Sequence, residues 1–454
     1  MFSRVLIANR GEVAVRVIRA CRDLGVAPVA VYSTADRDAL HVRLADRAVQ
    51  IGPPPAAASY LNIPSLIAAA AITGCEAVHP GWGFLAENAD FAAACQDNDL
   101  VFLGPRPETI EVMGDKIRAK VMMAGAGVPV VPGSEGATTL TEARALAAEL
   151  GYPLLLKATA GGGGRGMRLV ASDAELEAGF QTASAEAQAA FSNGKLYVER
   201  ALADARHVEI QVLGDGDGAV LTLGERDCSI QRRHQKLVEE APSPAVTPEL
   251  RAEMEAAARQ AAEALGYRGA GTLEFLLDEE GRFYFMEMNT RLQVEHPVTE
   301  MATGVDLVAA QLRIGAGEGL PRNGTATLAG HAIEFRINAE DPARDFLPTP
   351  GAVTRFRPPL GPGVRVDTHL FEGYSIPPQY DSLVAKVIVW AEDRPTALAR
   401  GRRALSEFEL EGVASTRNLA IEILSSDDFA AGRYTTSFLS GPGRGLAALN
   451  GAAP

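Results

Sequence analysis

The sequence predicts an α/β protein that begins with a Rossmann-like parallel-sheet domain. Strand-like and helix-like segments alternate from the N-terminus, which is typical of a parallel sheet with crossover helices. Farther along, a glycine-rich loop joins two short apolar runs, so a different kind of sheet follows. The sequence therefore predicts a parallel-sheet domain, a small domain with the glycine-rich loop, and a larger region of mixed strands and helices.

The first elements follow each other closely. Residues 4–8 form an apolar run, Gly11 marks a turn, residues 13–24 fit a helix, and residues 27–32 fit the next strand. A second strand-and-helix unit runs through residues 66–71 and 77–79. The proline-rich stretch 52–59 is expected to be a loop.

Turn residues concentrate in residues 125–133, which indicates the first domain boundary. Beyond it we expect strands at 154–157, 167–170 and 196–199 and a helix at 173–191, enough for a lid-sized domain. From about residue 203 strands and helices alternate without a break, and residues 441–445 are expected to begin a frayed tail.

Size and composition limit the class of protein. The 454 residues favour two to three domains, and 47% apolar with 22% charged residues are ordinary globular values. The net charge of −14 disfavours nonspecific binding to nucleic acids or anionic membranes. A local basic pocket for a small anion is still compatible with this charge.

Cysteine use and hydropathy point to a cytoplasmic protein. Cys21, Cys75, Cys95 and Cys228 form no Cys-x-x-Cys pair, which argues against a disulfide framework or a thiolate zinc site. The N-terminus lacks the apolar core of a signal peptide. No apolar run approaches the roughly 20 residues that span a bilayer.

The glycine loop formally contains the dinucleotide-binding pattern at Gly161, Gly163 and Gly166. That pattern requires a helix directly after the glycines, whereas residues 167–170 look like a strand. No Gly-Lys-Ser/Thr ends the run, so a Walker loop is also excluded. What remains is a mobile hairpin whose amides close over phosphates beside Lys157, or a flexible turn without a ligand.

Polar residues alternate along a second segment, at Glu287, Asn289, Arg291, Gln293 and Glu295. In an extended chain they would share one face. A solvated edge strand would explain them, but the interleaved apolar residues Phe283, Phe285, Met286 and Met288 argue against it. We therefore expect a functional face here.

Oxygen donors in and near this segment suit a divalent cation. Glu274, Glu287 and Asn289 are ligands that Mg²⁺ prefers, since it takes one or two carboxylates together with substrate phosphates. Arg291 supplies a planar fork for an oxyanion.

A third segment, residues 225–236, is dense in cations and ends at His234 and Lys236, with His207 upstream. A charged surface hairpin is one interpretation. Because so many cations gather within an acidic protein, an anion pocket is favoured.

Together these segments resemble the biotin carboxylases of the ATP-grasp superfamily. The matching stretches, in the family's order and spacing, are residues 79–88, 161–166, 225–236, 287–297 and 336–341. The resemblance implies an ATP-grasp fold with an N-terminal Rossmann-like domain, a small mobile lid and a larger C-terminal α+β domain. It places these at residues 1–115, 116–202 and 203–446, with a flexible tail at 447–454.

The resemblance also implies ATP-dependent carboxylation of biotin by bicarbonate through carboxyphosphate. It makes Glu295 the general base on bicarbonate, and Arg336 the cation that faces biotin. The ATP site would comprise Lys116, Lys157, Gly161, Gly162, Gly163, Gly164, Glu199, Leu202, His207, Gln231, His234, Glu274 and Glu287. Bicarbonate would be bound by Lys236, Arg291, Gln293 and Val294. Mg²⁺ or Mn²⁺ would be coordinated by Glu274, Glu287 and Asn289.

The implied partners are a biotin carboxyl carrier protein and carboxyltransferase subunits. We find no Met-Lys-Met of the kind that carries biotin, so biotin is expected on a separate carrier. A homodimer is implied by Arg19 and Arg365, whereas Asp23 and Pro362 depart from the commonest family pattern. Acetyl-CoA is the first choice of final acceptor, with propionyl-CoA and pyruvate as alternatives.

Two other functions compete with this one. Another ATP-grasp ligase would activate a different carboxylate as an acyl phosphate. A regulatory or scaffold subunit would bind ATP without bicarbonate-dependent turnover.

Overall fold

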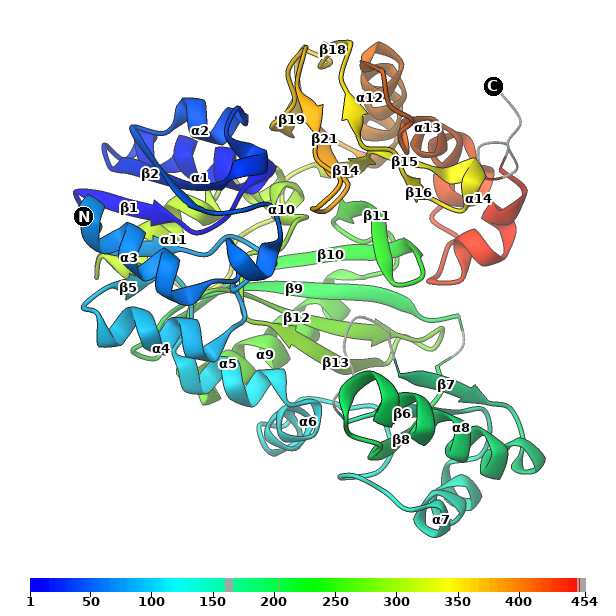
Figure 1. The fold of residues 1–454 in the computed structure, drawn as a ribbon. Coiled ribbons are helices and arrows are strands. Elements are labelled where there is room, and N and C mark those ends of the chain that lie inside the picture. The colour runs from blue at the N-terminus through cyan, green and yellow to red at the C-terminus, as the bar shows by residue number, and fades with distance from the viewer. Residues whose placement is uncertain (160–165, 203, 447–448, 450–454) are drawn as a thin grey trace.

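Parallel strands form the first sheet of the computed structural model, which describes residues 1–159, 166–202, 204–446 and 449 (Figure 1). The strand order is β3-β2-β1-β4-β5. Val5 and Ile7 pack into one buried cluster and Leu6 into another, so both faces of this sheet are covered. The strands are β1 (Arg4–Ile7), β2 (Ala27–Ser33), β3 (Arg47–Gly52), β4 (Ala77–His79) and β5 (Val101–Phe102). The Rossmann-like parallel sheet is confirmed.

Helices cover this sheet on both sides. α1 packs between the sheet and α11 (Leu307–Gly315), which comes from much later in the chain. Gly11, expected to form a turn before the helix, is the first residue of α1. Its φ of +68° lies in the left-handed region that favours glycine. The helices are α1 (Gly11–Asp23), α2 (Leu40–Leu44), α3 (Ile63–Thr73), α4 (Ala89–Asp97) and α5 (Pro107–Gly114).

A small antiparallel sheet, in the order β7-β6-β8, lies apart from the rest (Figure 1). Lys157 on β6 pairs with Met167 on β7, so a strand and not a helix follows the glycine loop. This confirms the two strands predicted on either side of the glycines and excludes the dinucleotide-binding pattern. The elements are α7 (Leu140–Leu150), β6 (Leu154–Ala158), β7 (Met167–Val170), α8 (Asp173–Phe191) and β8 (Leu196–Arg200). Gly161–Gly164 themselves lie outside the described residues.

The segment after α6 (Lys116–Gly125) links the small sheet to the main body. Val130 bridges to Phe285 of the central sheet, and Gly133 bridges to Glu199 of β8. A Cβ on Gly133 would lie 2.2 Å from the carbonyl oxygen of Val198, so this approach requires glycine. α6 itself packs into the central core, and the predicted lid range 116–202 stays a prediction.

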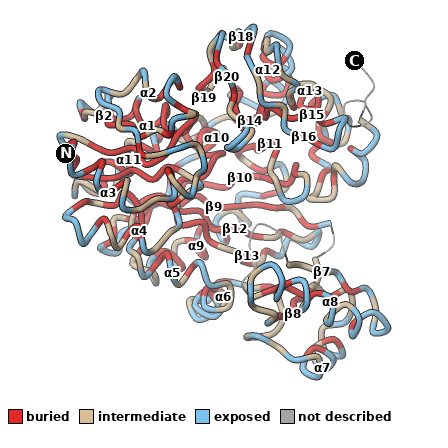
Figure 2. Tube along the Cα trace, in the orientation of Figure 1, coloured by how far each residue is buried: buried red, intermediate tan, exposed pale blue. Residues whose placement is uncertain are grey.

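The central sheet has eight strands in the order β13-β12-β9-β10-β11-β14-β21-β19. Its pairings are antiparallel, and Figure 2 shows that its strands are largely buried. The first five, in chain order, are β9 (Arg206–Asp215), β10 (Val220–Arg232), β11 (Gln235–Ala241), β12 (Arg268–Leu277) and β13 (Phe283–Asn289), and α9 (Pro248–Ala264) packs on β9 and β10. Arg233 and His234 join β10 to β11 with positive φ angles, as a two-residue hairpin turn requires.

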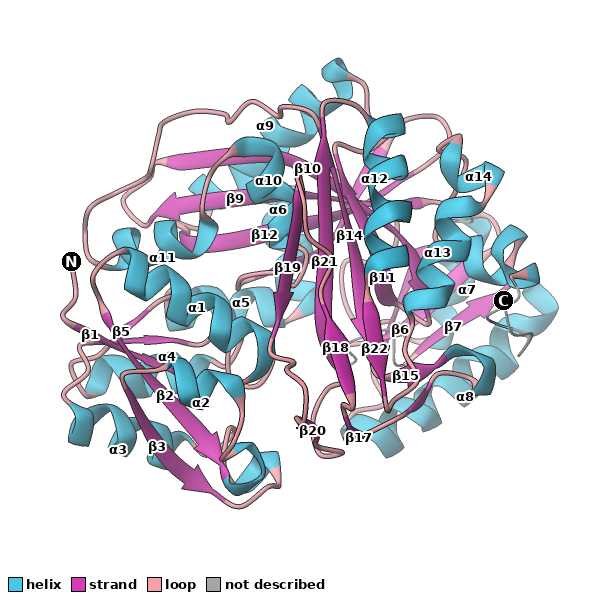
Figure 3. Cartoon of the chain, turned by 90° about the horizontal axis from the view of Figure 1, so that it is seen from above, coloured by secondary structure: helices cyan, strands magenta, loops and turns pink. Residues whose placement is uncertain are grey.

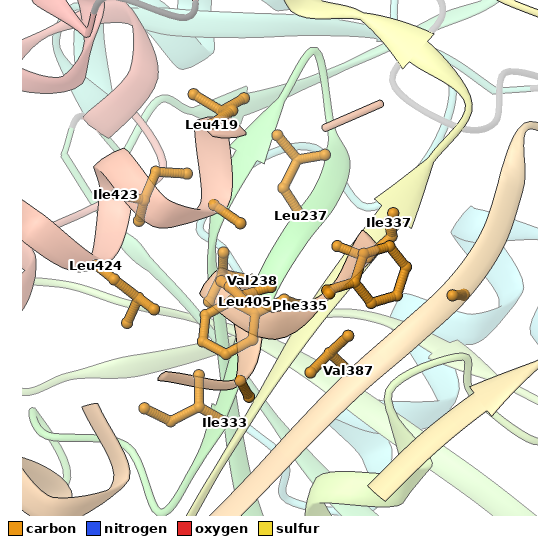
Figure 4. Packing of buried hydrophobic residues seen from close by; sticks show 14 of the residues in the cluster. Leu237, Val238, Ile333, Phe335, Ile337, Val387, Leu405, Leu419, Ile423 and Leu424 are labelled. Carbon is orange, nitrogen blue, oxygen red and sulfur yellow. The ribbon is translucent and has the colours of Figure 1, made fainter. Parts of the chain in front are cut away.

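The other three strands carry an apolar and a polar face. On the apolar face Phe335 and Val387 pack beneath α12 (Arg394–Glu407) and α13 (Arg417–Ser425) (Figure 4). The opposite face lies beside α10 (His296–Thr303). The strands are β14 (His331–Asn338), β19 (Val364–Thr368) and β21 (Leu383–Ala391).

Short strand pairs and a further helix complete the C-terminal region (Figure 3). They are β15 (Glu340–Asp341) with β16 (Leu347–Pro348), β17 (Gly351–Ala352) with β20 (Ser375–Ile376), β18 (Arg355–Arg357) with β22 (Glu409–Glu411), and α14 (Asp427–Ala430). Within the described ranges, no helix is long and apolar enough to cross a membrane.

The expected fraying from residue 441 is wrong. Two short 3-10 turns, Phe438–Ser440 and Pro442–Gly445, continue the fold, and Gly443 is buried against the Phe438 ring. The ring anchors the glycine-rich segment, which composition alone does not reveal. Of the tail predicted at 447–454, only residue 449 is described.

Candidate active site

The polar segment after β13 is a loop and not a continued strand. β13 ends at Asn289, and none of the described residues forms a strand ladder with residues 290–295. The Leu292 side chain is buried in the cluster that includes residues of α11. The prediction of one extended face through Glu295 is therefore wrong, although the polar groups still converge.

Arg291 holds this loop together. It donates from Nη2 to Oδ1 of Asn289 at 2.9 Å and from Nη1 to Oε1 of Gln293 at 3.0 Å. Its Nε donates to Glu87 at 2.7 Å, in the stretch that precedes α4. The guanidinium is thus fixed by side chains from two domains.

Two carboxylates face each other across β12 and β13. Glu274 and Glu287 are direct register partners, and Nδ2 of Asn289 donates to Oε1 of Glu274 at 2.9 Å. Burial, and then the nearby Glu274, raise the pKa of Glu287. Two opposed acids with an amide oxygen beside them form an oxygen donor set that fits Mg²⁺, whose charge would relieve their repulsion.

Lys236 lies at the centre of the site. Its Nζ donates to Glu209 at 2.7 Å, to Glu274 at 2.8 Å and to Glu295 at 2.7 Å. These carboxylates raise its pKa well above the ordinary value despite its burial, so the ammonium stays charged.

Glu295 is fully buried between two cations. Lys236 contacts its Oε1, and Nη2 of Arg336 donates to its Oε2 at 2.9 Å. Burial alone would raise the pKa of Glu295, but the two cations lower it to about 2. The group is therefore a charged carboxylate near neutral pH. Arg336 is itself fixed by Glu239, which accepts from its Nε.

Most of the described residues predicted for the nucleotide belong to strands of the small sheet or of the central sheet. Nζ of Lys157 donates to Glu199 at 2.6 Å. Burial lowers the pKa of Lys116, while the charges of Glu287 and Glu199 oppose that shift. Leu202 follows β8, and Gln231 is the register partner of Lys236.

Two histidines lie near this region. Nε2 of His207 is 3.2 Å from Glu274 and 3.6 Å from Glu209. Burial would lower the pKa of His207, but these acids raise it to about 9, so the imidazole is protonated near neutral pH. His234 is exposed, and its pKa is lowered by partial burial and by the charges of His207 and Lys157.

The cation-rich segment 225–236 is not a charged surface hairpin, and the anion pocket stays a prediction. Most of it is buried in β10, where Arg226 is bonded to Glu209. Arg232 and Arg233 pair with Asp345. Acids thus neutralise most of these cations already, and Lys236 is the one that reaches the site.

Sequence reasoning missed three acids that shape the site. Glu209 alternates with His207 on β9, a pattern that could have revealed it. Glu87 lies in a stretch that carried the family resemblance but no assigned role. Glu239 had no signal, because its neighbour Glu240 is equally acidic and binds Arg394 instead.

Protein families with known members match successive parts of the chain. Residues 1–110 match the family described as biotin carboxylase, N-terminal domain, and residues 334–441 match the biotin carboxylase C-terminal domain. Residues 115–323 match the carbamoyl-phosphate synthase L chain, ATP binding domain. The biotin carboxylase of Nostoc sp. is 56% identical over 440 residues, covering 96% of this chain and 98% of that protein.

Solved structures show the same fold. The crystal structure of a biotin carboxylase complex with β-γ-ATP from Campylobacter jejuni has a TM-score of 0.94 at 46% identity, covering 97% of this chain and 99% of that one. The biotin carboxylase domain dimer of Hydrogenobacter thermophilus 2-oxoglutarate carboxylase, with MgADP, ADP and bicarbonate, has a TM-score of 0.92 at 50% identity and covers 97% of each chain.

Proposed function

The chain belongs to the biotin carboxylase family, and we propose on this basis that its site uses ATP and bicarbonate to carboxylate biotin, releasing ADP and phosphate. The observation that carries the proposal is the buried Glu295 carboxylate, held by Lys236 and Arg336 beside the opposed acids Glu274 and Glu287. This arrangement offers a base, two anion-stabilising cations and a site for a divalent cation within one cluster.

The first step is attack by bicarbonate on the γ-phosphorus of ATP. A bicarbonate oxygen forms the new P–O bond, the bond to ADP breaks, and Glu295 takes the bicarbonate proton. A carboxylate whose pKa is about 2 is a weak base. Lys236 and Arg291 must therefore stabilise the charge that develops on bicarbonate, with Gln293 and the Val294 amide as further donors.

The second step uses the carboxyphosphate formed in the first. It breaks into CO₂ and phosphate, the phosphate takes the proton from the biotin ureido nitrogen, and that nitrogen bonds to CO₂. Arg336 would stabilise the negative charge on the ureido oxygen. Because carboxyphosphate is labile in water, a site that excludes water is required.

Glu274, Glu287 and Asn289 would hold Mg²⁺ or Mn²⁺ against the ATP phosphates, where the ion supplies charge neutralisation. Lys116 and Lys157 would bind phosphate oxygens from the other side. Glu199, Leu202, His207, Gln231 and His234 would surround the rest of the nucleotide. The phosphate role of Gly161, Gly162, Gly163 and Gly164 stays a prediction.

Replacing Glu287 with glutamine is expected to raise the Mg²⁺ concentration for half-maximal turnover by at least ~10-fold, because one of two opposed carboxylates is lost. Titrating turnover with Mg²⁺ at fixed ATP measures this change. The control Glu253→Gln changes an exposed acid on α9 and should leave the titration unaltered. An unchanged titration in Glu287→Gln would remove this residue from the metal site.

ADP release from MgATP, measured with and without bicarbonate and biotin, tests the proposed function. Turnover that needs both substrates supports biotin carboxylation. Turnover with amino acids or amines in place of biotin would indicate another ATP-grasp ligase. ATP binding without bicarbonate-dependent turnover would indicate a regulatory or scaffold subunit.

The proposed partners follow from the same chemistry. Biotin would arrive on a separate biotin carboxyl carrier protein, and carboxyltransferase subunits would pass the carboxyl group on, with acetyl-CoA as the first choice of acceptor. Mixing the enzyme with biotinylated carrier and each acyl-CoA or pyruvate, together with the matching carboxyltransferase, would identify the acceptor.

We also propose that the chain forms a homodimer and that its interface includes a surface hollow of about 430 Å³. Arg19 and Asp23 of α1 and Arg365 of β19 line it, whereas Pro362 is not among the lining residues. The Hydrogenobacter relative is a dimer of this domain. Charged groups gathered around one open hollow suit a self-complementary interface in which each copy pairs with the other.

Reversing one of these charges should separate the copies. We expect Arg19→Glu to raise the dimer dissociation constant by at least ~10-fold, since like charges would then meet at the interface. Sedimentation velocity over a concentration series measures this. Arg22→Glu, on the same helix but outside the hollow, is the control and should stay dimeric. A dimer that persists in Arg19→Glu would place the interface elsewhere.

A further inference from the structure

We propose that Lys386 and Glu12 act as a positioning pair that fixes the bicarbonate loop, defined as residues 290–295, for the chemical step. The inference rests on the proposed function, because it concerns how that site is held. It adds two residues that contact neither substrate nor metal in the proposed mechanism.

The bicarbonate loop needs anchors from outside itself. Its residues are mostly buried yet join no strand ladder, so their backbone carbonyls must find other partners. Nδ1 of His296 lies 2.7 Å from the Gln293 carbonyl oxygen. Nζ of Lys386 donates to the Val294 carbonyl oxygen at 2.8 Å. The Lys386 bond thus fixes the peptide group directly before Glu295.

Lys386 reaches this carbonyl from the polar face of the central sheet. It lies on β21 directly opposite Arg336 on β14, so the two side chains share a face. Arg336 contacts Glu295 while Lys386 contacts Val294. Neighbouring cations therefore hold consecutive residues of the loop.

Glu12 provides the counter-charge from the N-terminal domain. It lies in the first turn of α1, only 2% exposed, and its Oε2 is 3.2 Å from Nζ of Lys386, which is 0% exposed. Its Oε1 accepts a hydrogen bond from Nε1 of Trp82 at 3.1 Å. An ammonium this deeply buried requires a close anion.

The other acids near Lys386 do not take this role. Asp367 is its register partner on β19, but the Asp367 carboxylate is bound by Arg365. Glu334 lies on the same sheet face, but among the described residues its carboxylate forms no ion pair with Lys386. Among these acids, Glu12 is the one whose carboxylate forms an ion pair with Lys386.

The consequence for the reaction is geometric. The Val294 amide is proposed to bind bicarbonate, and the neighbouring Glu295 is proposed to take its proton. A shift of about 1 Å in such groups can cost ~100-fold in rate. Loss of the pair should therefore affect bicarbonate use while leaving the nucleotide contacts of β8, β9 and β10 in place.

Lys386→Met tests the proposal. It removes the charge and the donor but keeps an unbranched side chain. We expect kcat/KM for bicarbonate to fall at least ~10-fold, with the MgATP dissociation constant unchanged within about 2-fold. In the ligand-free protein, hydrogen exchange of the loop amides should rise while that of β13 stays the same.

Glu12→Gln is the second variant, in case Lys386→Met does not fold. It keeps the acceptor for Trp82 and the side-chain shape but removes the counter-charge, so we expect the same selective effect at smaller size. Arg394→Met is the matched control, because it breaks a buried ion pair with Glu240 on the same sheet without reaching the loop. It should lower thermal stability and leave bicarbonate kinetics unchanged.

The outcomes separate the two proposals. Bicarbonate-independent turnover in the wild type would defeat the proposed function. Hydrogen exchange of the loop amides would then still test whether Lys386 and Glu12 fix the loop. The positioning role would be overturned if the wild type depends on bicarbonate but a folded Lys386→Met or Glu12→Gln variant keeps wild-type bicarbonate kinetics and wild-type hydrogen exchange of the loop. Equal losses in Arg394→Met would also overturn it, since any destabilised variant would then behave alike.

Discussion

Glu295→Gln is expected to lower bicarbonate-dependent ADP formation by at least ~100-fold, because the amide cannot accept the bicarbonate proton. The substitution preserves shape, and the amide oxygen can still accept from Lys236 or Arg336. MgATP binding should persist, since Glu295 is not among the proposed nucleotide contacts. Initial rates of ADP formation, together with a direct measurement of MgATP affinity, separate these two effects.

Glu225→Gln is the control for this experiment. Glu225 is as deeply buried as Glu295 and is paired with Arg251, yet it takes no part in the proposed chemistry. We expect its loss to change stability and not the dependence on bicarbonate. A Glu295→Gln enzyme that keeps the wild-type rate would show that another group takes the proton.

Arg336→Met is expected to reduce carboxybiotin formation by ~100–1000-fold, because the charge on the ureido oxygen loses its cation. Bicarbonate-dependent ATP cleavage without biotin should fall much less. The fold should tolerate the change because burial raises the pKa of Glu239 to about 7 even with Arg336 close by, so Glu239 can take a proton once that cation is gone. Carboxybiotin and ADP, quantified in the same reaction, measure the split.

Arg251→Met serves as the control here, since it breaks the ion pair with Glu225 outside the site. It should leave the ratio of carboxybiotin to ADP at the wild-type value. If Arg336→Met also retains that ratio and its rate, then Arg336 does not face biotin, and a different cation must stabilise the ureido oxygen.

The parallel domain and the strand–loop–strand segment were predictable because local patterns determine them. Val5, Leu6 and Ile7 form an uninterrupted apolar run of the kind that a strand buried on both faces requires. Met167 follows the glycines as a strand because its own segment is apolar and short. These features are visible in the local sequence even though long-range contacts complete their packing.

The path of the bicarbonate loop was not predictable from alternation. β13 ends at Asn289, and Leu292 then packs in a cluster made partly by the N-terminal domain, more than 200 residues away in sequence, which local alternation does not indicate. Lys386 and Glu239 were missed for the same reason. Their importance comes from the strand order of the central sheet, which places them opposite or beside the site residues.

The central claim is that bicarbonate attacks ATP directly, with Glu295 as its base. Bicarbonate labelled in all three oxygens with ¹⁸O tests it, with mass analysis of the phosphate and of carboxybiotin trapped as a stable ester. The account predicts that each phosphate carries one labelled oxygen and that the carboxyl group retains the other two. Phosphate without label would contradict the account, because the γ-phosphoryl group would then have been transferred to another acceptor.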